Sequence, residues 1–211
     1  MSSKASFLLR LFLFYCLQIA GSAHAADSPV LLVVGDSLSS GYRIDTENSW
    51  PVLLEQRLQA SGRTVRVVNA SRKGATAEDG RKRLKALLAR NQPRWVILEL
   101  GANDGLRRGS LSSLRNNIDN MLAMVRSSGA VPILVGMRLP PNYDSAYANE
   151  FAALYVRMAR ESDTVLTPFL LERIANHPEL FQADHLHPNA EAQPLLLESV
   201  WASVDAVISP R

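Results

Sequence analysis

Residues 33–42 read VVGDSLSSGY, an apolar run that stops abruptly at small polar residues. Glycine, aspartate and serine are all common in turns, so the simplest interpretation is a turn that follows a buried strand. A second interpretation is that this turn presents the hydroxyl group of Ser37 as a nucleophile. The segments that follow the other apolar runs of the chain discriminate between the two interpretations.

Short apolar runs recur along the chain and predict strands. Each run is apolar almost throughout, which is typical of strands that are covered on both faces, as in a parallel sheet. The predicted strands cover residues 30–34, 65–69, 95–100, 132–137 and 165–167.

Between these runs lie longer segments with apolar residues at helical spacing. They predict helices over residues 50–60, 76–90, 114–125, 148–160 and 191–207. Strands that alternate with helices favour a parallel sheet with right-handed crossovers and helices on both faces. We therefore expect an α/β fold, a flavodoxin-like three-layer α/β/α sandwich with a five-stranded parallel sheet.

The first 25 residues have the features of a secretory signal peptide. Lys4 and Arg10 supply positive charge, residues 11–21 are apolar but too short to span a bilayer, and Ala23-His24-Ala25 has the small-x-small cleavage pattern. A membrane anchor is the alternative interpretation. We expect cleavage after Ala25, a periplasmic or secreted location, and one globular domain over residues 26–211.

Charge and cysteine content exclude several classes of partner and site. The formal charge of the whole chain is +3, and it falls to +1 without residues 1–25, which hold Lys4 and Arg10 but no acidic residue. This small net charge argues against a nucleic-acid partner. The only cysteine, Cys16, lies in the signal segment, so the rest of the chain can form no disulfide, thiolate nucleophile or cysteine metal site.

Polar residues or glycines follow every predicted strand, at the edge where open α/β sheets bind their ligands. In chain order these segments are GDS (35–37), NASRKGAT (69–76), GANDG (101–105), RLPPNY (138–143) and, after a short helix, DHLHP (184–188). Their shared position predicts an active site at this edge of the sheet.

The residue types at this edge are those of a serine hydrolase. A serine becomes a strong nucleophile when a histidine takes its proton and a carboxylate orients that histidine. Ser37, Asp184 and His187 supply these groups in the chain order Ser, Asp, His. His187 is preferred to His185, because a three-residue separation across a turn can bring the carboxylate and the imidazole together. Pro188 suits a helix start and would place His187 just before a helix.

A serine hydrolase also needs hydrogen-bond donors for the oxyanion that forms in the transition state. The backbone N–H groups of Ser37 and Gly74 and the side-chain amide of Asn103 are the candidates. Glycine at position 74 would let the backbone approach the substrate closely, and an amide at position 103 would donate without adding charge.

The four blocks GDSLSSGY, NASRKGAT, ELGANDG and DHLHP resemble those of the SGNH, or GDSL-type, serine hydrolases. The four residues that give this family its name would be Ser37, Gly74, Asn103 and His187. QPRWVILELGANDGLR and RLPPNY are similar to segments of the bacterial periplasmic multifunctional esterases of the thioesterase, arylesterase and lysophospholipase type. The resemblance implies hydrolysis of acyl thioesters, aryl esters or lysophospholipids through an acyl-enzyme, without a metal or organic cofactor.

Departures from the family pattern bear on the substrate. The relatives usually carry serine and aspartate beside the glycine of the second block, whereas this chain has Lys73 and Ala75. Lys73 is therefore expected to influence substrate choice, with a lysine that only points into solvent as the alternative. Leu139, Pro140 and Tyr143 are candidate walls for an acyl chain.

The expected partner is a small acyl ester or thioester, with possible contact to lipid substrates at a membrane surface, and the expected oligomeric state is a monomer. Two other functions stay open on the sequence. A carbohydrate O-acetyl esterase would use the same fold and residues. A non-catalytic flavodoxin-like protein would instead bind a phosphate or other ligand in the loop of residues 37–41 at a helix N-terminus, and would need neither Asn103 nor Asp184 and His187.

Overall fold

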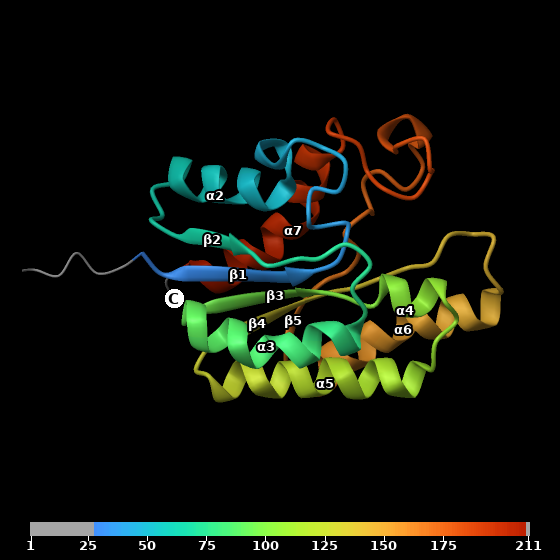
Figure 1. Cartoon of the computed structure of the whole chain (residues 1–211), viewed down its shortest axis with the longest axis horizontal. Helices are drawn as coiled ribbons and strands as arrows, with labels where there is room; N and C mark the ends of the chain where they lie inside the picture. Colours follow the sequence, from blue (N-terminus) through green and yellow to red (C-terminus); the bar gives the residue numbers. More distant parts are fainter. Residues whose placement is uncertain (1–27, 210–211) are drawn as a thin grey trace, which may run out of the picture.

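The computed structural model describes residues 28–209, so the predicted signal peptide lies outside the described residues. Its sheet contains five parallel strands in the order β2-β1-β3-β4-β5 (Figure 1). The strands are β1 Val30–Gly35, β2 Arg66–Asn69, β3 Trp95–Glu99, β4 Val131–Val135 and β5 Val165–Thr167. The expected α/β fold with a five-stranded parallel sheet is confirmed.

Helices cover both faces of the sheet: α3, α5 and α6 lie on one face, and α2 and α7 lie on the other (Figure 1). The α-helices are α2 Trp50–Ala60, α3 Ala77–Asn91, α4 Ala102–Leu106, α5 Leu111–Ser127, α6 Ser145–Glu161 and α7 Gln193–Ile208. Two short 3-10 helices are η2 Thr46–Asn48 and η3 Pro178–Leu180. None of the helices within residues 28–209 has both the length and the apolar character needed to cross a membrane.

Alternate residues of β1 pack into the two helical layers. Leu32 and Val34 belong to the core beneath α3 and α5, whereas Leu31 and Val33 belong to the core beneath α2 and α7. All four side chains are fully buried. A strand that is covered on both faces needs apolar residues at every position, which explains why the run has no polar alternation.

The order of the strands places the predicted active site at the ends of the central strands. β1 pairs with β2 on one side and with β3 on the other, so the chain changes direction across the sheet between β2 and β3. In such sheets, ligands bind beyond the carboxyl ends of the strands at the point where the direction changes. Ser37 follows β1 and Asn103 follows β3, so both residues lie at that point.

Several helices begin at other residues than the sequence predicts. Capping residues determine where a helix begins, whereas the prediction used hydrophobic periodicity. α5 begins three residues early, at Leu111, since the Ser110 hydroxyl accepts a hydrogen bond from the Ser113 N–H. α6 likewise begins at Ser145, where Asp144 accepts from the Tyr147 N–H. The short helix α4 is absent from the prediction, because GANDG has the composition of a turn.

The turn between β3 and α4 depends on Gly101. Its φ of +118° is a conformation that residues with a side chain rarely adopt. A Cβ atom at this position would lie 1.8 Å from the hydroxyl oxygen of the buried Tyr155. That hydroxyl donates to the carbonyl of Leu100 at 2.8 Å. The start of α4 is therefore fixed by a glycine and a buried tyrosine.

Gly101→Ala is expected to lower the free energy of unfolding by about 3 kcal/mol or more, through backbone strain and the clash with Tyr155. Gly62→Ala is the matched control, because Gly62 has a φ of +77° but a Cβ there would meet nothing within 4 Å. The free energy of unfolding of the control should fall by only about 1 kcal/mol, the cost of the left-handed backbone alone. Urea titrations of both variants measure the difference, and equal losses would contradict the role assigned to Tyr155.

Candidate active site

Ser37, His187 and Asp184 form a continuous line of hydrogen bonds. The Ser37 Oγ lies 2.9 Å from the His187 Nε2, and the His187 Nδ1 lies 2.8 Å from the Asp184 Oδ2. With Nδ1–H donating to the carboxylate, Nε2 is left as the acceptor for the serine hydroxyl. The structure thus brings together three residues that the sequence predicts to act together.

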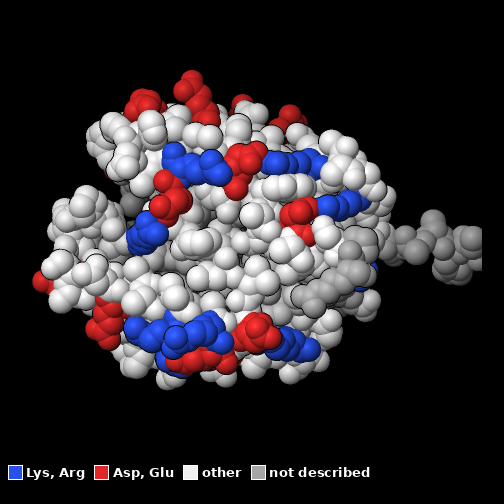
Figure 2. All heavy atoms as spheres, turned by 180° about the vertical axis from the view of Figure 1, so that it is seen from behind, with Lys and Arg blue, Asp and Glu red and all other residues white. Residues whose placement is uncertain are grey.

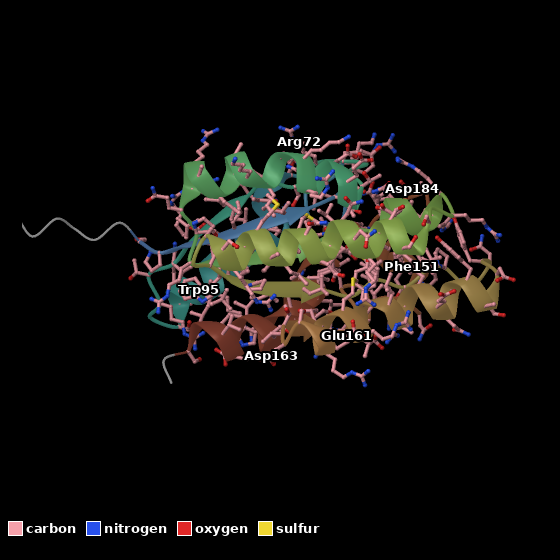
Figure 3. The ribbon with its side chains drawn as sticks, turned by 90° about the horizontal axis from the view of Figure 1, so that it is seen from below. Arg72, Trp95, Phe151, Glu161, Asp163 and Asp184 are labelled. Carbon is pink, nitrogen blue, oxygen red and sulfur yellow. The ribbon has the colours of Figure 1, made fainter. Side chains whose placement is uncertain are left out.

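Asp184 is held in its ionised form. The backbone N–H of His187 donates to its Oδ1 at 3.0 Å and that of Leu186 at 3.1 Å. The bond from the His187 N–H is the main cause that lowers the pKa of Asp184 to about 2, and partial burial opposes it. In Figure 3, Asp184 lies near the end of the molecule opposite Trp95, which begins β3. The carboxylate therefore sits at the carboxyl edge of the sheet.

Hydrogen bonds on both sides fix the loop that carries His187, the predicted triad histidine. Phe181 and Pro188 form an isolated antiparallel bridge, and the Gln182 N–H donates to the His187 carbonyl at 2.7 Å. The Gln182 side chain donates to the Tyr42 carbonyl at 2.8 Å and so ties this loop to the segment after β1. Nothing in the sequence pattern points to Gln182, because its partner is 140 residues away.

Pro188 closes this narrow loop and does not start a helix. The expectation that His187 stands just before a helix is therefore wrong, since α7 begins at Gln193. His185 is exposed and has a φ of +54°, in the left-handed region. It forms no part of the line of hydrogen bonds to Ser37.

Two backbone donors of the predicted oxyanion hole are free. The N–H groups of Ser37 and Gly74 have no acceptor among the described residues, which leaves them available to a substrate. Gly74 has a φ of +73°, and a Cβ there would meet nothing within 4 Å. Glycine is thus required by the backbone conformation, and the space next to it is open.

The Asn103 amide connects the segments that carry these donors. Its Nδ2 donates to the Asp36 Oδ2 at 3.1 Å and to the Ala75 carbonyl at 3.1 Å. Asp36 precedes Ser37 and Ala75 follows Gly74. One side chain therefore draws the three predicted oxyanion donors together. Both of its N–H groups are engaged, so donation to a substrate requires one of these bonds to be shared or exchanged.

A pair of buried carboxyl groups lies next to Ser37. Burial raises the pKa of Asp36 to about 7, although the Leu38 N–H and the Asn103 amide both donate to it. Burial and the charge of Asp36 raise the pKa of Glu99 well above its usual range. The Glu99 Oε2 accepts from the Asp36 N–H at 3.2 Å and from the Ser39 hydroxyl at 2.6 Å. Glu99 went unnoticed in the sequence, although an acidic residue within an apolar strand was the available signal.

Lys73 reaches the site through Tyr42. Its Nζ donates to the Tyr42 hydroxyl at 3.0 Å, and the Tyr42 ring centroid lies 4.5 Å from that of His187. The Lys73 side chain is exposed. The sequence analysis did not single out Tyr42, since nothing in the pattern places it against the histidine.

The predicted acyl-wall residues lie against α4, near Asn103. The Tyr143 hydroxyl donates to the Leu106 carbonyl at 2.8 Å, and Leu139 packs so closely on Gly105 that a Cβ there would lie 2.8 Å from it. Pro140 is half-buried in the same loop. An open hollow of about 310 Å³ is lined by Leu106, Arg107, Arg108, Asn142 and Tyr143. The space-filling surface is notched at the left edge of Figure 2, the side toward which the strands point.

The phosphate-cradle alternative loses its structural basis. Residues 37–43 form turns, and the next α-helix begins only at Trp50, so the loop does not lie at the N-terminus of an α-helix. Within residues 28–209, no three His, Cys, Asp or Glu side chains come together as a metal site requires.

Comparisons with known proteins agree on one family. Residues 33–194 match the GDSL-like lipase/acylhydrolase family. Esterase TesA of Pseudomonas aeruginosa is 41% identical over 94% of this chain and 98% of its own. Thioesterase 1/protease 1/lysophospholipase L1 of Escherichia coli K12 is 42% identical over 89% of this chain and 87% of its own. The crystal structure of esterase EstA from Pseudoalteromonas sp., inhibited by monoethylphosphonate, is 31% identical with a TM-score of 0.81, covering 86% of this chain and 99% of that one.

The raised pKa of Asp36 predicts a specific pH dependence of stability. Its contribution is fully present below the unfolded pKa, near pH 4, and is lost as the pH rises through about 7. Asp36→Asn removes this loss of stability, because an amide does not ionise. Relative to the wild type, the variant should therefore gain stability between about pH 4 and pH 8, by up to about 4 kcal/mol.

Asp184→Asn is the control with the opposite sign. Because the pKa of Asp184 is lowered to about 2, its contribution is present above about pH 4 and is lost as the pH falls through 2. This variant should be less stable than the wild type at neutral pH, and the gap should close in acid. Urea midpoints across a pH series measure both slopes, and a flat difference for Asp36→Asn would contradict its raised pKa.

Proposed function

The chain belongs to the GDSL-like lipase/acylhydrolase family, and we propose that it is a serine esterase that acts on acyl thioesters, aryl esters or lysophospholipids. It is an ester-hydrolysing enzyme, as its close relatives are. The observation that carries the proposal is the line of hydrogen bonds from the Ser37 Oγ through His187 to Asp184. A surface serine without a catalytic role would not be expected to form such a line of hydrogen bonds.

In the acylation step, the Ser37 Oγ attacks the carbonyl carbon of the ester, and its proton moves to the His187 Nε2. The carbonyl oxygen takes up the negative charge and is bound by the N–H groups of Ser37 and Gly74. When the tetrahedral intermediate collapses, the bond to the leaving group breaks. The leaving oxygen or sulfur then takes the proton from Nε2.

In the deacylation step, a water molecule gives its proton to the His187 Nε2 and attacks the acyl-enzyme at the same carbonyl carbon. Collapse of the second intermediate releases the carboxylic acid and returns the proton to the Ser37 Oγ. Asp184 stays ionised throughout and stabilises the imidazolium that forms in each step. This scheme is complete without a metal or an organic cofactor.

Asn103 becomes the third oxyanion donor by exchanging one of its acceptors. Its bond to Asp36 is made to a carboxyl group that is fully buried and needs donors. Above about pH 7, where Asp36 is ionised, the bond of Asn103 to the neutral Ala75 carbonyl is the weaker anchor. The negative oxygen of the intermediate therefore competes for the N–H that points toward Ala75.

Substrate contacts divide between two sides of Ser37. Leu139, Pro140 and Tyr143 form an acyl-chain wall against α4, and Lys73 lies on the side of His187. The substrate classes follow the names of the relatives, an esterase and a thioesterase that is also a lysophospholipase. Residues 1–25 direct export with cleavage after Ala25, and residues 26–211 form the monomeric hydrolase in the periplasm or outside the cell.

Ser37→Ala is expected to abolish ester hydrolysis, because no other group can form the acyl-enzyme. A reactive alkyl phosphonate ester should label the wild type once, at Ser37, and should leave this variant unlabelled. Ser40→Ala is the matched control, since Ser40 is a half-buried serine in the same loop. Mass spectrometry of labelled peptides and hydrolysis of an aryl ester measure the outcome. Wild-type activity in Ser37→Ala would refute the proposal.

The two neighbouring histidines provide a second test. His187→Ala should lower kcat by several orders of magnitude, whereas His185→Gly should lower it by less than about tenfold. His185→Gly should also raise stability by about 1 kcal/mol, since glycine relieves the left-handed backbone at φ +54°. Kinetics on an aryl ester and thermal melts report both effects. An inactive His185→Gly with an active His187→Ala would overturn the triad assignment.

A further inference from the structure

The position of the leaving group follows from the proton transfers of the proposed function. His187 Nε2 receives the Ser37 proton and gives it to the leaving oxygen or sulfur, so the leaving group must lie against the imidazole. The acyl chain extends from the other side of the carbonyl carbon. Side chains that pack on the His187 ring therefore border the space through which the leaving group departs.

Tyr42 is the aromatic side chain that packs on this ring. The two ring centroids are 4.5 Å apart and the rings are tilted by 55°. The Tyr42 backbone is held by Gln182, which belongs to the same loop as His187. Tyr42 is thus a fixed, partly exposed surface beside the catalytic imidazole.

Two cations lie on the Tyr42 ring. The Lys73 Nζ is 4.3 Å from the ring centroid and donates to the hydroxyl at 3.0 Å, and the Arg43 guanidinium is 5.1 Å from the centroid. Contacts of this kind are worth only about 0.5–1 kcal/mol at exposed sites, but they favour one placement of a long side chain. An ammonium group has three donors, and the bond to Tyr42 uses one of them. Lys73 therefore keeps two donors for a ligand.

Neither cation has a carboxylate partner among the described residues. Asp45 lines the same open hollow as Arg43 but forms no ion pair with it. Other cations do have acidic partners, such as Arg57 with Glu198 and Arg115 with Glu161. On the face shown in Figure 2, several positive and negative side chains lie next to each other. Two unpaired cations beside the catalytic histidine form a local positive site on a nearly neutral protein.

From this arrangement we propose that Lys73 and Arg43, held on the ring of Tyr42, form a subsite for a leaving group that carries a phosphate. The inference rests on the proposed function, since it takes His187 as the group that protonates the leaving atom. A phosphate accepts hydrogen bonds from an ammonium and, in a bidentate manner, from a guanidinium. Two sources of this chemistry are the glycerophosphate of a lysophospholipid and the phosphorylated carrier of a thioester.

The test compares substrates that differ only in the phosphate. One pair is 1-decanoylglycerol and its 3-phosphate, both used below the concentration at which they aggregate. The other pair is S-decanoyl-4′-phosphopantetheine and S-decanoylpantetheine. In the wild type, the ratio of kcat/KM for the phosphate-bearing substrate to that for the neutral one should fall as salt is raised.

Lys73→Met should lower this ratio by about tenfold for at least one pair, and Lys73→Met with Arg43→Met should lower it further. Lys85→Met is the matched control, since Lys85 is an exposed lysine on α3 outside the site, and it should leave the ratio unchanged. A loss confined to the glycerol pair identifies a lipid headgroup, and a loss confined to the thioester pair identifies the carrier. An unchanged ratio in both pairs overturns the subsite.

A binding experiment separates this inference from the proposed function. Glycerol 3-phosphate should shift the NMR signals of Tyr42 and His187 in the wild type, with affinity weakened at least about fivefold in Lys73→Met and unchanged in Lys85→Met. Glycerol serves as the neutral comparison. An inactive wild type that binds glycerol 3-phosphate in this way would refute the esterase and keep the anion subsite. Equal affinity in Lys73→Met and the wild type would overturn the subsite even in an active esterase.

Discussion

Asp36, at the end of β1, is fully buried, and a buried carboxyl group needs hydrogen-bond donors. The arrangement of the site depends on the groups that donate to it. The Leu38 N–H bonds one carboxyl oxygen and the Asn103 amide bonds the other. The same amide reaches the Ala75 carbonyl, so the segments after β1, β2 and β3 meet at one side chain. The proposed oxyanion donors are thereby placed before any substrate binds, and such preorganisation is the source of most of the effect of an oxyanion hole.

This arrangement costs stability, and the rest of the fold offsets it. Asp36 and Glu99 are both buried, and the backbone at Gly74 and Gly101 adopts conformations that other residues avoid. The central strands that lead to the site carry fully buried apolar side chains on both faces of the sheet. Strain that would unfold an isolated loop is tolerated here, because the loops leave rigid strands whose packing does not depend on them.

The sequence predicts the fold and the triad because both depend on local patterns. Continuous apolar runs indicate buried parallel strands, and the spacing of Asp184 and His187 permits their contact across a turn. Contacts between distant segments leave no such pattern. Gln182 bonds Tyr42 across 140 positions, and the Asn103 amide bonds Asp36 across 67. The extent of α4 and the role of Tyr42 follow from packing that only the folded chain defines.

In the proposed function, the acyl side and the leaving-group side of Ser37 are formed by different parts of the fold. The acyl side is formed by α4 and the loop of residues 138–143, which are joined by the bond from Tyr143 to Leu106. The leaving-group side is formed by Tyr42, Lys73 and the histidine loop, which are joined through Gln182. None of these side chains contributes to both sides, and Ser37 with its proposed oxyanion donors lies between them. If these assignments hold, substitutions at Lys73 change the choice of leaving group and leave the choice of acyl chain to α4. The two specificities would then vary independently around one catalytic centre.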